Sequence, residues 1–208
     1  MPSRNTVREF APDSYYHVYN RGVEKRHIFL DEQDYRVFIG LLKRYLSHDV
    51  HRKPDRHLKR NVSQHVSLLA YCLMPNHYHL LLYQTSEDGV TQLMRRVITG
   101  YVMYFNDRYQ RVGALFQSKY KASHINADAY LHHISRYIHQ NPDKYETWSA
   151  SSLPYYLNKK KTPTWLNTAP VLELFQNDAK IYHEFLKEYE ENRQELAELK
   201  WQLANDLE

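Results

Sequence analysis

The stretch HVSLLAYCLMPNHYHLLLYQ, His65 to Gln84, decides the fold of this chain. It holds two apolar runs on either side of Pro75, which cannot continue a central strand, so two strands joined by a turn are predicted. Two histidines, His77 and His79, interrupt the second run. Because alternate side chains of a strand point to the same face, both imidazoles are expected to project together. Tyr78 between them is then a packing residue on the opposite face.

Apolar periodicity predicts further elements on both sides of this stretch. The first helix is expected to begin at the N-cap Asp31, and the last core helix to begin at Asn126 or Asp128 and to end before Pro142. The order is that of an α+β fold, a ferredoxin-like antiparallel sheet with helices on one face, which leaves the other face open for a ligand. The predicted elements are strands at 14–22, 65–75, 77–85 and 113–125 and helices within the stretches 27–46, 90–110 and 127–141.

The length of 208 residues allows one domain with an appendage. We expect residues 1–145 to form the main domain and 146–208 to form an irregular linker followed by a long acidic helix. The acidic face of this helix is most simply a solvated surface, and an acidic flap that competes with nucleic acid is the alternative. The apolar side of the helix consists of Ile181, Phe185, Leu186, Tyr189, Leu196, Leu199 and Leu203.

Charge and composition narrow the class of partner and the location. Residues 1–125 carry a net charge of +8 and residues 126–208 carry −4, with a basic peak over 43–61. A basic body suits a polyanion such as nucleic acid, although a solvated surface fits equally well. The single cysteine, Cys72, rules out a disulfide framework or a cysteine-based zinc site. Without an apolar leader or a run of about 18 apolar residues, we expect a cytoplasmic location and no membrane partner.

The histidine pair has a possible partner in the stretch SRYIHQNP. Tyr137 and Asn141 lie four residues apart on a predicted helix and therefore share one of its faces. Two imidazoles can bind one divalent ion, and an amide oxygen is a suitable third ligand for Mg²⁺ or Mn²⁺. From the residues alone the alternative stays open that Tyr137 packs in the core and Asn141 caps the helix.

Two motifs together resemble those of the single-tyrosine HUH transposases. LMPNHYHLLL is similar to the HUH motif of histidine, bulky apolar residue and histidine, and RYIHQNP is similar to the nucleophile helix. YHVYNRG near the start and LFQSKYKA before the last core helix agree. The resemblance is strongest to the REP-associated tyrosine transposases, relatives of the transposases of small bacterial insertion sequences, and covers about residues 14–145. In the insertion-sequence branch the third ligand is typically Gln, whereas this chain has Asn141.

The resemblance implies a metal-dependent endonuclease and strand transferase for single-stranded DNA at REP-like hairpins. Tyr137 would form a 5′-phosphotyrosine, and His77, His79 and Asn141 would hold Mg²⁺ or Mn²⁺. Whether the chain acts as a monomer or a homodimer is left open. So are two alternatives, a non-catalytic hairpin-binding module and a metal-dependent enzyme acting on RNA. The expected phosphate contacts are Arg21, Arg95, Arg96, Lys119 and Lys121, with the loop Lys43–Arg60 either solvated or bound to the hairpin backbone.

Overall fold

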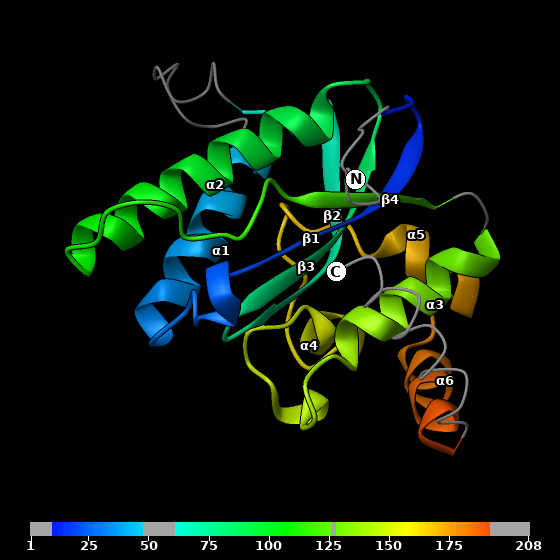
Figure 1. The fold of residues 1–208 in the computed structure, drawn as a ribbon. Helices are drawn as coiled ribbons and strands as arrows, with labels where there is room; N and C mark the ends of the chain where they lie inside the picture. Colours follow the sequence, from blue (N-terminus) through cyan, green and yellow to red (C-terminus); the bar gives the residue numbers. More distant parts are fainter. Residues whose placement is uncertain (1–9, 48–60, 126–127, 192–208) are drawn as a thin grey trace, which may run out of the picture.

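The computed structural model describes residues 10–47, 61–125 and 128–191, which form an antiparallel sheet flanked by helices (Figure 1). The α+β class and the antiparallel sheet are thereby confirmed. Pro75 and Asn76 form the turn between the second and third strands, as predicted. The strands are β1 (Ser14–Arg21), β2 (Val66–Met74), β3 (His77–Gln84) and β4 (Lys121–Ile125), in the order β2-β3-β1-β4.

The helices of the core agree with the predicted positions. Asp31 caps the first of them, since its carboxylate accepts a hydrogen bond from the backbone of Asp34 at 3.2 Å. The predicted caps Asn126 and Asp128 lie at a gap in the description, so neither is tested. Within the described ranges, no helix has both the length and the apolar character needed to cross a membrane. The helices are α1 (Glu32–Leu46), α2 (Gly89–Arg108), α3 (Asp128–His139), α4 (Leu153–Tyr156), α5 (Ala169–Leu172) and α6 (Ala179–Glu191), with short 3₁₀ turns η1 (Val23–Lys25), η3 (Tyr145–Thr147) and η4 (Glu173–Phe175).

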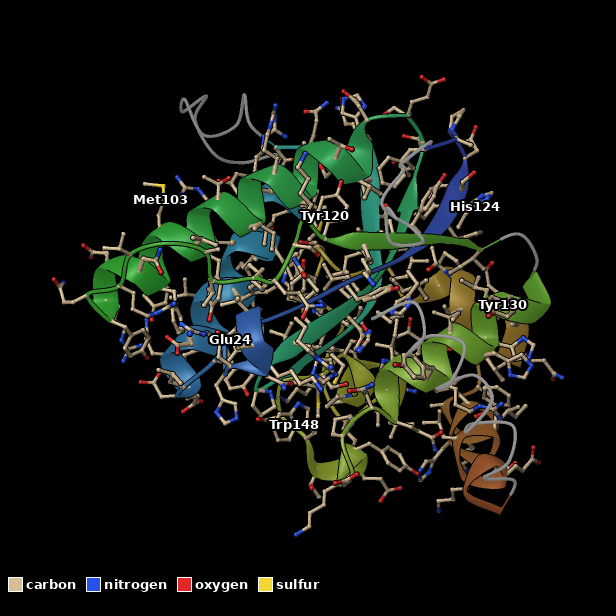
Figure 2. All side chains as sticks on the ribbon, in the orientation of Figure 1. Glu24, Met103, Tyr120, His124, Tyr130 and Trp148 are labelled. Carbon is tan, nitrogen blue, oxygen red and sulfur yellow. The ribbon has the colours of Figure 1, made fainter. Side chains whose placement is uncertain are left out.

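Helices α1 and α2 cover the first face of the sheet. Val18 of β1 and Leu80 of β3 are buried there with Phe38 of α1 and Tyr101 of α2. The outer side of α2 faces away from this core, where Met103 is 67% exposed (Figure 2). The first face therefore carries a conventional apolar core.

A buried carboxylate joins the two helices of this face. Asp34 of α1 is 0% exposed and accepts hydrogen bonds from the hydroxyls of Tyr104 and Tyr109, each at 2.9 Å. Arg108 of α2 adds a charged hydrogen bond at 3.0 Å. Because a buried charge is costly unless it is paired, this set of donors fixes α1 against the end of α2.

Helix α3 covers the second face of the sheet, which corrects the prediction that helices lie on one face only. A β-bulge between Leu68 and Ala70 interrupts the alternation, and Leu69 and Ala70 both belong to the second core. Strands β2 and β3 are thus buried on both faces, which explains their nearly continuous apolar sequence. The second core includes Leu69, Cys72 and Leu81 from the sheet and Leu131, Ile134 and Ile138 from α3.

The segment after residue 145 packs along the edge strand β2. The backbone of Cys72 forms an isolated antiparallel β-bridge with Ser151, and that of Leu68 forms a parallel β-bridge with Leu166. The edge of the sheet is therefore covered by the chain's own backbone. Of the predicted apolar side of α6, Leu186 is buried, and Ile181 and Phe185 are partly buried against the second core. Tyr182, which was not part of the prediction, is also fully buried. Residues 192–208 lie outside the described part, and the division at residue 145 stays a prediction.

The fourth strand is shorter than the predicted 113–125. Phe116 makes only an isolated bridge with Gly22, and regular pairing with β1 begins at Lys121 opposite Tyr19. The segment between these two contacts has more residues than β1 offers partners, so it loops out. Gly113, with φ at +94°, takes a backbone conformation that favours glycine.

Gly22 is predicted to be indispensable for the loop after β1. A Cβ at this position would overlap the carbonyl oxygen of Arg26 and come within 2.9 Å of Ile28 Cγ2. Gly22→Ala should therefore lower the free energy of unfolding by about 1–3 kcal/mol, measured by urea denaturation. Gly40→Ala is the matched control, because a Cβ on this exposed part of α1 meets nothing within 4 Å. It should raise the same quantity by about 0.5–1 kcal/mol, and equal losses in both variants would contradict the close packing.

Candidate metal and nucleophile site

Two histidines project from the start of β3 toward α3. His77 and His79 have ring centroids 5.0 Å apart, with their planes at 86°. Tyr78 between them is 0% exposed and belongs to the core on the opposite face. The predicted joint direction of the two imidazoles and the packing position of Tyr78 are therefore observed.

Helix α3 brings a phenol and an amide to this histidine pair. The ring of Tyr137 packs edge-on against His79, with centroids 5.3 Å apart. Asn141 lies just beyond the end of α3, and its Oδ1 is 2.9 Å from His77 Nε2, across 64 positions of sequence. One chain thus gathers all four side chains that the sequence pointed to.

A third histidine lies behind the pair, and the sequence analysis did not single it out. His17 Nε2 is 2.9 Å from His79 Nδ1, and the two rings are stacked with centroids 5.0 Å apart. His17 also contacts the ring of Tyr137 edge-on at 5.9 Å. Alternation of side chains along β1 places His17 on the same face as Tyr19. Tyr19 pairs with His79 in the sheet, and only this pairing shows that His17 lies on the face of the histidine pair.

Burial controls the protonation of the site. It lowers the pKa of His77 to about 4. It lowers the pKa of His79 well below the usual value, with smaller contributions from the charges of His77, His17 and Arg21. Burial also raises the pKa of Tyr137 to about 12. At neutral pH the imidazoles are therefore uncharged, with lone pairs available to a metal, whereas the phenol keeps its proton.

Two of the five predicted phosphate-binding residues lie at the site. Arg21 is opposite His77 in the pairing of β1 with β3, and its charge contributes to lowering the pKa of this histidine. Lys121 is opposite Tyr19, which is itself opposite His79, so the three share a row across the same face of the sheet. The site therefore has positive charge beside the tyrosine and the histidines.

The other predicted phosphate contacts are not brought to the histidines. Lys119 is exposed on the segment that leads into β4. Arg95 and Arg96 belong to α2, which covers the opposite face of the sheet. Residues 48–60 of the basic loop Lys43–Arg60 lie outside the described part. A role of these residues in binding DNA stays a prediction.

The donor atoms fit a hard divalent cation. Ligands about 2.1 Å from an octahedral ion and at right angles to each other lie about 3 Å apart. His77 Nε2 and Asn141 Oδ1, at 2.9 Å, meet this condition. His17 occupies Nδ1 of His79, which leaves Nε2 of that ring available to a metal. Among the described residues no group of three or more His, Cys, Asp or Glu is placed to hold a metal, so a metal here depends on the amide of Asn141.

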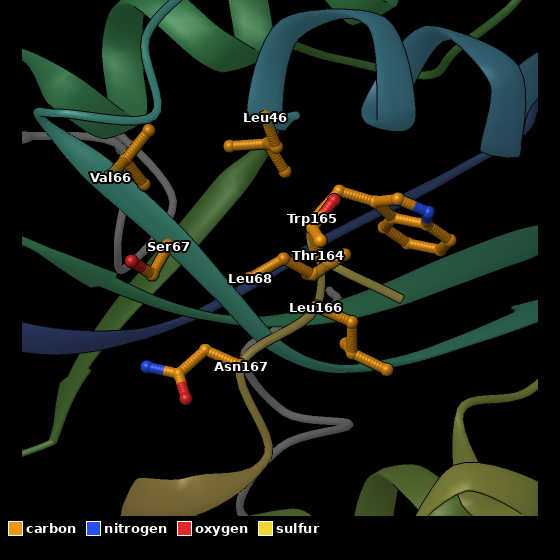
Figure 3. Close-up of a pocket in the computed structure, with 8 residues that line it drawn as sticks. All are labelled: Leu46, Val66, Ser67, Leu68, Thr164, Trp165, Leu166 and Asn167. Atoms are coloured by element: carbon orange, nitrogen blue, oxygen red, sulfur yellow. The ribbon is translucent and has the colours of Figure 1, made fainter. Parts of the chain in front are cut away.

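A separate cavity of about 280 Å³ lies between the end of α1, the start of β2 and residues 164–167 (Figure 3). Leu46, Val66 and Trp165 contribute much of its apolar wall, and Ser67 and Asn167 contribute polar atoms. Its lining holds no ionisable side chain, so we assign no chemistry to it.

The fold and the gathered side chains define a class of protein in which an antiparallel sheet presents a histidine pair to a tyrosine on a helix. The family model described as "Transposase IS200 like" matches residues 12–141, which is more than half of the chain and includes all four side chains. The chain therefore belongs to the IS200-like transposase family.

Two solved structures are similar to the chain at low sequence identity. A REP-associated tyrosine transposase bound to a REP hairpin has a TM-score of 0.55 and 14% identity, and the match covers 76% of this chain and 88% of that one. This likeness shows a shared fold. A candidate transposase from Deinococcus radiodurans R1 has a TM-score of 0.39 and 15% identity, covering 66% of this chain and 95% of that one. No curated protein sequence matches the chain.

The buried histidines predict a loss of stability in mild acid. Burial lowers the pKa of His77 to about 4 and the pKa values of His17 and His139 to about 3, from an ordinary value of 6.5. The unfolded chain therefore binds more protons below pH 6.5. The free energy of unfolding should fall as the pH drops from about 6.5 toward 4, by up to about 1.4 kcal/mol per pH unit for each histidine.

Urea unfolding across this pH range checks the prediction. His139→Gln removes one of the titrating groups. The slope of the free energy of unfolding against pH should therefore decrease by the contribution of one histidine. A profile that stays flat between pH 6.5 and about 4.5 would show that these rings are not held neutral by burial.

Proposed function

We propose that this chain is a metal-dependent single-stranded DNA endonuclease and strand transferase that acts at hairpin DNA through a 5′-phosphotyrosine. The observation that carries the proposal is the meeting of Tyr137 and Asn141 with His77 and His79 in one chain. Membership of the IS200-like family supports DNA as the substrate. The shared fold with a transposase bound to a REP hairpin supports hairpin DNA as its form.

The proposed reaction is a reversible phosphoryl transfer to a phenol. Tyr137 Oη attacks the scissile phosphorus in line, a P–Oη bond forms, and the P–O3′ bond breaks. The phenol loses its proton and the departing strand gains one as a 3′-hydroxyl. Attack by the 3′-hydroxyl of another strand reverses these steps and rejoins DNA without external energy. Bound Mg²⁺ or Mn²⁺, held by His77, His79 and Asn141, supplies Lewis-acid stabilisation of charge on the phosphate oxygens.

The surrounding cations support the same chemistry. Tyr137 must give up its proton although burial raises its pKa to about 12, and the charge of Arg21 acts in the opposite direction on that pKa. Arg21 and Lys121 border the site and would hold the phosphate backbone without reading the base sequence. Arg95, Arg96 and Lys119 are proposed to contact DNA farther from the bond that is cut.

Tyr137→Phe should abolish the covalent product. Phenylalanine keeps the packing of α3 but has no oxygen to attack phosphorus. A single-stranded hairpin oligonucleotide with Mn²⁺ should give a protein–DNA adduct on a denaturing gel with the wild type and none with this variant. Tyr78→Phe, altered on the opposite face of the same sheet, should keep the adduct within a few-fold of the wild-type level.

The same assay separates the alternative functions. An adduct in Tyr137→Phe would overturn the choice of nucleophile. Tight hairpin binding without an adduct in the wild type would favour a non-catalytic binding module. Preferred cleavage of a matched RNA oligonucleotide would favour an enzyme acting on RNA, because the 2′-hydroxyl distinguishes the two substrates.

Asn141→Ala should raise the metal requirement. The variant loses the amide oxygen next to His77, so the Mn²⁺ concentration that gives half-maximal cleavage should rise by about 10–100-fold, as for the loss of other metal-site contacts. Asn167→Ala removes an exposed asparagine at the separate cavity and should leave this concentration unchanged. Equal Mn²⁺ dependence in both variants would exclude Asn141 as a ligand.

A further inference from the structure

We propose that His17 is a positioning residue that fixes the ring of His79 for metal binding, an inference that rests on the proposed metal site. His17 Nε2 and His79 Nδ1 lie 2.9 Å apart, a distance at which the two nitrogens share one hydrogen. This contact uses Nδ1 of His79, so Nε2 of the same ring stays available to bind the ion.

The hydrogen bond determines which nitrogen of His79 is available to the ion. An imidazole that binds a metal through Nε2 carries its hydrogen on Nδ1 and donates it to a neighbouring acceptor. His17 Nε2 is that acceptor here. In this arrangement His17 carries its own hydrogen on Nδ1, which is buried without a hydrogen-bond partner among the described residues.

The packing around His17 restrains the ring. Its side chain is 1% exposed and lies nearly parallel to His79, with 16° between the ring planes. It also stacks on Tyr19, at 4.9 Å between centroids, and Tyr19 in turn lies 6.0 Å from His79. It also meets Tyr137 edge-on. One restrained ring therefore contacts both a proposed metal ligand and the proposed nucleophile.

A purely structural role makes a different prediction. If His17 only filled space, an aliphatic side chain of similar size would change stability and leave the metal affinity of the folded protein unaltered. A positioning role requires an acceptor at the place of Nε2, because an apolar replacement leaves Nδ1 of His79 buried without a partner. The two roles are therefore separated by metal binding itself, without reference to DNA cleavage.

The test is a titration of the full chain with Mn²⁺, in which free Mn²⁺ is followed by electron paramagnetic resonance. His17→Leu should weaken binding by about 10–100-fold. His17→Gln, whose amide oxygen reaches the place of Nε2, should bind within a few-fold of the wild type. Tyr16→Phe is the matched control on the opposite face of β1, where the hydroxyl accepts a hydrogen bond from the backbone of Ala11. It should lower the melting temperature without changing the Mn²⁺ affinity.

Each outcome decides for or against the inference. Unchanged Mn²⁺ affinity in His17→Leu would overturn it and leave the proposed function intact. A wild-type chain that does not bind Mn²⁺ would overturn the proposed metal site and this inference with it. If His17→Leu does not fold, His17→Asn takes its place, because its side chain is too short to reach Nδ1 of His79. Affinity that is weaker in His17→Asn than in His17→Gln supports the inference, and equal affinity overturns it.

Discussion

The packing of α3 against the second face of the sheet is the contact on which the candidate site depends. Ile134 and Ile138 are buried with Cys72 of β2 and Leu81 of β3. Burial of an aliphatic side chain of this size stabilises the fold by about 1.5–3 kcal/mol, so a few such residues fix the rotation of the helix. Tyr137 lies between the two isoleucines in sequence. Its distance from His79 is therefore set by apolar contacts that take no part in the chemistry.

A buried polar network joins the end of α3 to α6 and to Ser152, which is hydrogen-bonded to Tyr71 at the edge of the sheet. His139 Nδ1 is 2.6 Å from the hydroxyl of Tyr182 on α6, and Nε2 is 2.7 Å from Ser152 Oγ. The side chain of Gln140 donates a hydrogen bond to the backbone of Leu186 at 2.7 Å. Because both nitrogens of a fully buried imidazole are satisfied, breaking either contact leaves a polar group unpaired, at a cost of about 1–3 kcal/mol. The segment after residue 145 thus secures the helix that carries the proposed nucleophile.

The two faces of the sheet serve different purposes. The first face buries Tyr78 and Leu80 among apolar side chains, as stability requires. The second face buries His17 and His79 and partly buries His77. Burying an imidazole stabilises the fold less than burying an aliphatic side chain, and burial disfavours the charged form of the ring. Imidazoles at these positions stabilise the fold less than apolar side chains would, which is expected where the polar groups have a function.

Sequence reasoning succeeded where the geometry is local. The spacing of His77 and His79 along a strand, and of Tyr137 and Asn141 along a helix, fixes a common face within one element. The position of α3 was missed, although the continuous apolar run before Pro75 indicated a strand buried on both sides. The role of Tyr182 could not be predicted from local pattern, because its partner His139 is 43 positions away.

His17 was missed for a more instructive reason, since its partner depends on the register of β1 against β3. Side chains alternate between faces, so a slip of one residue would place Val18 beside the site and turn His17 toward Phe38 in the first core. An imidazole buried there without a hydrogen bond would cost about 1–3 kcal/mol. In the observed register His17 instead finds His79 at 2.9 Å. The polar groups that the proposed chemistry requires therefore also penalise the wrong pairing of the strands, so site and register specify each other.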